Sequence, residues 1–135
     1  MQKTKTPHIL VVDDDPVTLM VITKYLKEES FEFTTTESGE EALNLLQKNP
    51  RIYSAIILDR MMPKVSGIDV LHKLYINPTL NKIPIIMLTS HAEREDVGAA
   101  IIAGVFDFLF KPVDKDLLIL VLRRALKKAA SCVSS

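Results

Sequence analysis

The chain has 135 residues and a formal net charge of zero, with 17 basic and 17 acidic side chains. This length suits one domain with a single core, and the balanced charge gives no basic surface that would recommend direct binding to nucleic acid. Its one cysteine, Cys132, excludes an internal disulfide and a thiolate metal cluster. The apolar runs are no longer than strands, so we expect neither a signal peptide nor a membrane span, and we expect a cytoplasmic location.

Short apolar runs alternate with segments of helical periodicity five times along the chain. This alternation predicts an α/β domain with a doubly wound parallel sheet. The predicted strands cover residues 9–12, 31–36, 54–58, 83–88 and 106–110. The predicted helices begin near residues 16, 39, 67, 92 and 114 and end near residues 29, 48, 76, 103 and 130.

Polar residues fit the joints between these elements. Asp15 followed by Pro16 suits the N-cap and first position of the first helix. Residues 90–93 resemble a capping box for the fourth helix, and Gly104 is placed to end that helix in a left-handed conformation. We expect one domain over residues 8–130, between a disordered segment, 1–7, and a tail or linker stub, 131–135.

Four of the predicted strands finish in polar residues. They are followed by the acidic run Asp13-Asp14-Asp15, by Asp59, by Thr89-Ser90 and by Lys111-Pro112. In open α/β sheets ligands bind at the carboxyl ends of the strands, so these side chains are expected to lie together. Crowded carboxylates are costly without a cation, and an all-oxygen site suits Mg²⁺ or Mn²⁺. The cap explains Asp15, which leaves Asp13, Asp14 and Asp59 for the metal.

Five separated motifs carry a resemblance to a known family. They include Val11-Val12-Asp13-Asp14, Leu58-Asp59-Arg60-Met61-Met62-Pro63 with Gly67, Leu88-Thr89-Ser90, and Phe110-Lys111-Pro112. In this order and spacing they resemble the signature of the response-regulator receiver domain of two-component signalling, over about His8 to Ala130. The resemblance implies a flavodoxin-like fold, with five parallel strands in the order 2-1-3-4-5 and five helices.

The resemblance also implies a function. Asp59 would take a phosphoryl group from a histidine kinase or a histidine phosphotransfer protein, with Mg²⁺ present, and the surface of the fourth helix, fifth strand and fifth helix would then change. Phosphoryl transfer depends mainly on positioning and on neutralising the phosphoryl oxygens, which a metal and an ammonium provide. The family's members are signalling switches that promote their own phosphorylation and dephosphorylation, and they are not enzymes acting on a separate substrate.

The family's pattern assigns roles at the metal. Asp14 and Asp59 would bind Mg²⁺ directly, Asp13 through water, and the backbone carbonyl of Met61 would complete the protein's ligands. Mn²⁺ would substitute.

Other roles concern the phosphoryl group. Thr89 and Lys111 would hold its oxygens, and the bond to Pro112 would be cis. Phe108 is a candidate rotamer switch that fills the space opened when Thr89 moves inward. The alternative is a core phenylalanine, because strand alternation predicts that residues 106, 108 and 110 share one face.

Three positions are expected to modulate the site. The Met61 side chain would shield the acyl phosphate, while Ser90 and His91 follow Thr89, with His91 expected as an exposed loop residue. On the last helix, a predicted buried stripe repeats at helical spacing: Leu118, Val121, Leu122, Ala125 and Ala129. The stripe leaves Leu120 opposite the core, as a candidate contact of a phosphorylation-dependent homodimer or an effector.

Three alternatives remain at this stage. The run from Asp13 to Val17 also fits the opening of the haloacid-dehalogenase hydrolases, where Asp13 would be the nucleophile and Asp15 the acid/base, but Asp59 would then be idle. A degenerate receiver acting only as a binding platform is disfavoured, because every residue required for modification is present. An FMN-binding flavodoxin would need a phosphate loop where this chain has carboxylates.

Overall fold

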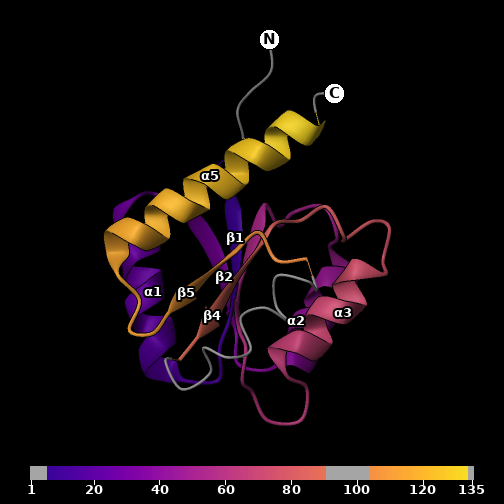
Figure 1. Ribbon diagram of the computed structural model, residues 1–135, viewed down its shortest axis with the longest axis horizontal. Coiled ribbons are helices and arrows are strands. Elements are labelled where there is room, and N and C mark those ends of the chain that lie inside the picture. Colours follow the sequence, from indigo (N-terminus) through magenta and orange to yellow (C-terminus); the bar gives the residue numbers. More distant parts are fainter. Residues whose placement is uncertain (1–5, 91–103, 134–135) are drawn as a thin grey trace.

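A computed structural model describes residues 6–90 and 104–133 of the chain (Figure 1). Within them, one sheet of five parallel strands has the order β2-β1-β3-β4-β5. The strands are β1 (His8–Val12), β2 (Glu32–Thr36), β3 (Ala55–Asp59), β4 (Ile85–Thr89) and β5 (Asp107–Phe110). The expected flavodoxin-like strand order is thus confirmed.

Helices cover both faces of this sheet. The described residues form α1 (Pro16–Glu28), α2 (Gly39–Lys48), α3 (Gly67–Tyr75) and α5 (Lys115–Val133). Figure 1 shows α1 and α5 on one side of the sheet, with α2 and α3 on the other. Four of the five predicted helices are therefore seen. The fourth, predicted over residues 92–103, lies outside the described residues, as does His91.

Caps fix the helix starts that lie near the strand ends. The Asp15 carboxylate accepts a hydrogen bond from the backbone N–H of Val17 at 3.0 Å, and Pro16 occupies the first turn, as predicted. Ser66 and Asp69 form a capping box at the start of α3. Gly104 has φ of +99°, so it has the left-handed backbone expected of it.

Strand alternation divides the core into two clusters. Ile9 and Val11 of β1 pack toward α1 and α5, whereas Leu10 and Val12 pack toward α2 and α3. Each fully buried aliphatic side chain of this kind contributes roughly 2 kcal/mol. None of the helices in ranges 6–90 and 104–133 has the length and apolar character needed to cross a membrane.

Two expectations were wrong in detail. The chain bends at Phe106 and β5 starts at Asp107, so Phe106 packs with the α1 and α5 cluster while Phe108 packs on the opposite face. The prediction that residues 106, 108 and 110 share one face therefore fails at residue 106. Helix α5 also continues to Val133 rather than ending near Ala130.

Candidate phosphorylation and metal site

Three carboxylates gather at the carboxyl edge of the sheet. Asp13 follows β1 and Asp59 ends β3, and these neighbouring strands pair Val12 with Leu58, so the two aspartates lie side by side. Both are buried, with exposed fractions of 0% and 3%. Oxygens of Asp13, Asp14 and Asp59 all lie within 4.8 Å of one another. The sheet thus brings together the three predicted metal ligands that act through carboxylates.

Lys111 places an ammonium against this cluster. Its Nζ lies 3.0 Å from Oδ2 of Asp13 and 3.1 Å from Oδ1 of Asp59. Burial alone would lower the pKa of Lys111, but the two carboxylates outweigh burial and raise it, so the side chain stays charged. The peptide bond from Lys111 to Pro112 is cis.

The carboxyl group of Asp59 titrates far from its ordinary range. Burial and the neighbouring charge of Asp13 raise its pKa to about 7, although Lys111 and a hydrogen bond from the Met61 backbone act in the opposite direction. Without a further cation, Asp59 is therefore partly protonated near neutral pH. A cation bound beside it would favour the ionised form, which is the form able to act as a nucleophile.

The site fits a hard divalent cation. Three ionised carboxylates and one ammonium would leave a net charge of −2 (−3 + 1) at a largely buried edge. Oδ1 of Asp13 accepts a hydrogen bond from the Asp15 backbone N–H at 2.9 Å, whereas Oδ2 is paired with the Lys111 ammonium. The atoms that these three carboxylates offer to a metal are all oxygens, which Mg²⁺ and Mn²⁺ prefer as ligands.

A tight loop follows Asp59. A Cβ atom on Gly67 would lie 2.2 Å from the carbonyl oxygen of Asp59, so only glycine fits, and the Gly67 N–H donates to Arg60 O at 2.8 Å. This contact closes the loop of residues 60–66, which carries Met61. The Met61 side chain is 58% exposed beside the site.

Thr89 and Phe108 lie on the other face of the sheet. Thr89 ends β4, is buried, and donates from its hydroxyl to Ser90 O at 3.4 Å. By alternation it shares the face of Met87, which packs toward α2 and α3. Phe110 is its register partner on β5, and half-buried Phe108 meets Phe110 edge to face, with ring centroids 5.6 Å apart. Sequence reasoning assigned no role to Phe110.

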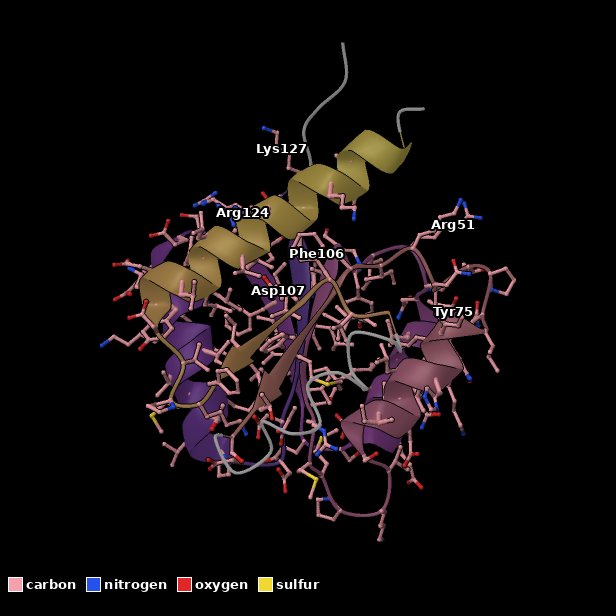
Figure 2. All side chains as sticks on the ribbon, in the orientation of Figure 1. Arg51, Tyr75, Phe106, Asp107, Arg124 and Lys127 are labelled. Carbon is pink, nitrogen blue, oxygen red and sulfur yellow. The ribbon has the colours of Figure 1, made fainter. Side chains whose placement is uncertain are left out.

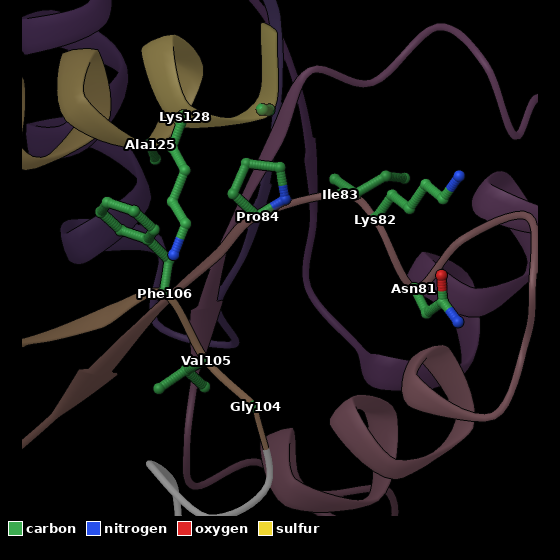
Figure 3. Close-up of a pocket in the computed structure, with 10 residues that line it drawn as sticks. Asn81, Lys82, Ile83, Pro84, Gly104, Val105, Phe106, Ala125 and Lys128 are labelled. Atoms are coloured by element: carbon green, nitrogen blue, oxygen red, sulfur yellow. The ribbon is translucent and has the colours of Figure 1, made fainter. Parts of the chain in front are cut away.

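A separate hollow of about 240 Å³ opens at the opposite end of the sheet (Figure 3). Residues before β4, before β5 and near the end of α5 line it. Lys128 places its ammonium over the Phe106 ring, 5.8 Å from the centroid, and the lining contains no carboxylate. It is therefore unrelated to the metal cluster. Figure 2 places Phe106 and Asp107 at this end, with Arg124 and Lys127 pointing outward from α5.

Comparison with known proteins agrees with this geometry. The response regulator receiver domain family matches residues 9–123. Two-component response regulator ORR5 of Oryza sativa subsp. japonica is 34% identical over 113 residues, 84% of each chain. Transcriptional regulatory protein GlrR of Escherichia coli (strain K12) is 36% identical over 127 residues, 93% of this chain and 28% of that protein. A response regulator receiver domain protein from Clostridium thermocellum superposes with a TM-score of 0.86 and 30% identity, covering 93% and 98% of the two chains.

The chain belongs to the response regulator receiver domain family. It is a receiver domain of two-component signalling, with the acidic cluster typical of a phosphoacceptor site. The hydrolase alternative finds no support. Asp15, its required acid/base, is engaged in capping α1, where its two oxygens accept hydrogen bonds from Val17 and Thr18.

Proposed function

We propose that Asp59 is the phosphoacceptor of this domain. The observation that carries this proposal is the position of Asp59 at the end of the central strand β3, beside two other aspartates and 3.1 Å from the Lys111 ammonium. Among the described carboxylates, only Asp59 and Asp13 combine burial, a neighbouring cation and a position in the acidic cluster at a strand end. Asp13 differs in its position, because it follows β1, whereas Asp59 is the last residue of the central strand β3.

The reaction is an in-line displacement at phosphorus. An ionised Asp59 oxygen attacks the phosphorus of a phosphohistidine, the P–O bond forms as the P–N bond breaks, and the imidazole leaves with the electron pair and takes up a proton. Lys111 lies where it can neutralise a phosphoryl oxygen. Hydrolysis of the acyl phosphate would return the domain to its unmodified state. In this proposal the site promotes both reactions, its own phosphorylation and its own dephosphorylation.

Mg²⁺ fits this scheme, and Mn²⁺ would substitute. Asp14, Asp59 and the backbone carbonyl of Met61 would hold the ion directly, and Asp13 would hold it through water. The bound ion supplies positive charge that stabilises the charge on the phosphoryl oxygens.

Thr89 and Phe108 are proposed to report the modification. A phosphoryl group adds strong acceptor oxygens, so after transfer the Thr89 hydroxyl, which donates to Ser90 O in this structure, has a stronger acceptor within the site. Its movement would make room for Phe108, two register positions away on β5. Ser90 and the Met61 side chain would modulate how long the modification lasts.

The phosphoryl donor is proposed to be a histidine kinase or a histidine phosphotransfer protein in the cytoplasm. Apolar side chains flank the acidic cluster in sequence: Val17 and Met20 on α1 are 62% and 67% exposed, and Met61 follows Asp59. Such exposed apolar groups beside a charged site suit protein docking. We expect Met20→Glu to slow transfer from a phosphorylated partner protein but not from acetyl phosphate. Ile76→Glu, at a 79% exposed position beyond α3, is the matched control.

Direct labelling tests the proposal. Acetyl phosphate with Mg²⁺ should add one phosphoryl group, labile to hydroxylamine, at Asp59, and EDTA should prevent it. Asp59→Asn should abolish the label and keep the fold. A label that persists in Asp59→Asn and disappears in Asp13→Asn would instead assign Asp13 as the nucleophile, and sustained turnover of an aryl phosphate would support hydrolase activity.

A further inference from the structure

Gly39, the first residue of α2, is packed too tightly to carry a side chain. A Cβ atom built there would lie 2.9 Å from Cγ1 and from the carbonyl oxygen of Val65, and 2.9 Å from Cγ2 of Val70. Because one of these atoms belongs to the backbone, a rotamer change cannot relieve the contact. The N-terminus of α2 therefore presses directly on the loop that follows Asp59.

On the loop side of this contact, the backbone next to Val65 is conformationally constrained. Lys64 has φ of +67°, a left-handed conformation that is uncommon for lysine, and the Val65 N–H donates to Pro63 O at 2.8 Å. Together these features describe a γ-turn, a tight and strained arrangement. Gly67 closes the base of the same loop against Asp59. Because the loop is constrained at these points, a displacement of Val65 would also displace Met61 and Met62.

On the α2 side of this contact, a series of hydrogen bonds leads to Asp13. The Asp13 N–H donates to Thr36 O at 3.1 Å, and the Thr36 hydroxyl donates to Ser38 O at 3.4 Å. Ser38 then caps α2, because its Oγ accepts from the Glu41 N–H at 3.1 Å. A continuous chain of contacts thus runs from Asp13 through Ser38 and Gly39 to Val65.

We propose that Gly39 is a positioning residue for the metal site. By seating Val65 directly on α2, it sets the distance between Asp13 at the end of β1 and the loop that presents the Met61 carbonyl. This role rests on the proposed function, in which Asp13 and Met61 serve the same ion. Gly39 itself touches neither the ion nor the phosphoryl group.

The test compares Gly39→Ala with Glu40→Ala in the full chain. Alanine is a better helix former than glycine, so an uncrowded position 39 would tolerate the change. We expect Gly39→Ala to weaken Mg²⁺ binding about tenfold, in the range seen when groups supporting metal ligands are altered. It should also shift the amide resonances of residues 61–66 in the metal-free protein. Glu40→Ala, at an exposed neighbour on the same turn, should do neither.

Two further variants complete the design. Gly39→Ala combined with Val65→Ala removes the Cγ1 contact but keeps the contact with the Val65 carbonyl oxygen, so it should bind Mg²⁺ no better than Gly39→Ala. Val65→Ala alone, which leaves α2 intact, should weaken Mg²⁺ binding by a few-fold and decides the matter if Gly39→Ala does not fold. Wild-type affinity in Gly39→Ala, or in Val65→Ala where only that variant folds, would overturn the positioning role alone. A wild-type chain that binds no Mg²⁺ would overturn the proposed function as well.

Discussion

The ammonium of Lys111 lies 3.0 Å from Oδ2 of Asp13, so a side chain that follows β5 reaches across the sheet edge to the end of β1. The same ammonium contacts Asp59, and it therefore offsets part of the negative charge of two buried carboxylates. In the metal-free protein Lys111 thus partly replaces the divalent cation.

Replacing Lys111 should expose this contribution. Lys111→Ala is expected to lower the free energy of unfolding of the metal-free protein by about 2 kcal/mol at pH 8, less than for a fully buried pair because the Lys111 side chain keeps some contact with water. Urea denaturation measures this loss. Lys115→Ala is the control, since Lys115 pairs with Glu28 at the surface and should contribute much less. Equal losses in the two variants would contradict the bridging role of Lys111.

Asp59→Asn should make the metal-free protein more stable at neutral and higher pH. The pKa of Asp59 is about 7 in the folded chain, compared with about 3.9 in an unfolded one. At a pH between these two pKa values, the folded state binds more protons than the unfolded state does. The contribution of Asp59 to the free energy of unfolding therefore falls as pH rises. We expect Asn to gain a few kcal/mol over wild type at pH 8 and almost nothing below about pH 3, where Asp59 is protonated in both states.

The measurement is the difference in unfolding free energy between wild type and Asp59→Asn across this pH range in EDTA. Using the difference cancels the other titrating groups. Saturating Mg²⁺ should reverse the order, because the ion stabilises only a folded state that binds it. A difference that did not vary with pH would show that Asp59 titrates normally.

Thr89→Ala should separate modification from response. We expect Thr89→Ala and Lys111→Ala to accept some phosphoryl group from acetyl phosphate, because the nucleophile is intact, but to propagate little change. Beryllium fluoride, standing in for the phosphoryl group on Asp59, should shift amide resonances of β5 and α5 in wild type. The same pattern in Thr89→Ala would mean that Phe108 does not respond through Thr89.

Leu120→Glu tests the outer face of α5. Leu120 is 47% exposed, and Leu117, one turn earlier, is 46% exposed, so the two leucines together form an apolar strip among charged residues. If this strip makes a homodimer, beryllium fluoride should promote association of wild type in sedimentation experiments, and Leu120→Glu should prevent it. Ile52→Glu, at a 48% exposed position before β3, should associate like wild type. Association that is unaffected by Leu120→Glu would remove Leu120 from the contact.

The sequence predicted the sheet well because its strands carry strong local signals. Short apolar runs ending in polar residues identified the strands that carry Asp13, Asp59 and Thr89, and Asp15-Pro16 located the start of α1. The buried stripe of α5 was correct from Leu118 to Ala125, although Ile119 is buried too and Ala129 only partly.

Tertiary contacts account for what the sequence did not predict. The bend at Phe106 changes the face of one aromatic residue, and an alternating pattern carries no sign of such a bend. The crowding at Gly39 and Gly67 involves atoms from other segments, so the spacing of residues around each glycine does not reveal it. Gly67 was predicted only as part of a motif, because its close approach to the Asp59 carbonyl oxygen arises from the folding of the loop between them.

The division of the core into two clusters has a consequence for the dynamics of the modified protein. Asp13 and Asp59 continue the face of the sheet that packs on α1 and α5, whereas Thr89 continues the face that packs on α2 and α3. A phosphoryl group held by Lys111 and Thr89 would link residues belonging to opposite layers. Local opening of either layer would then require breaking that link, so amide hydrogens in both layers should exchange more slowly with solvent.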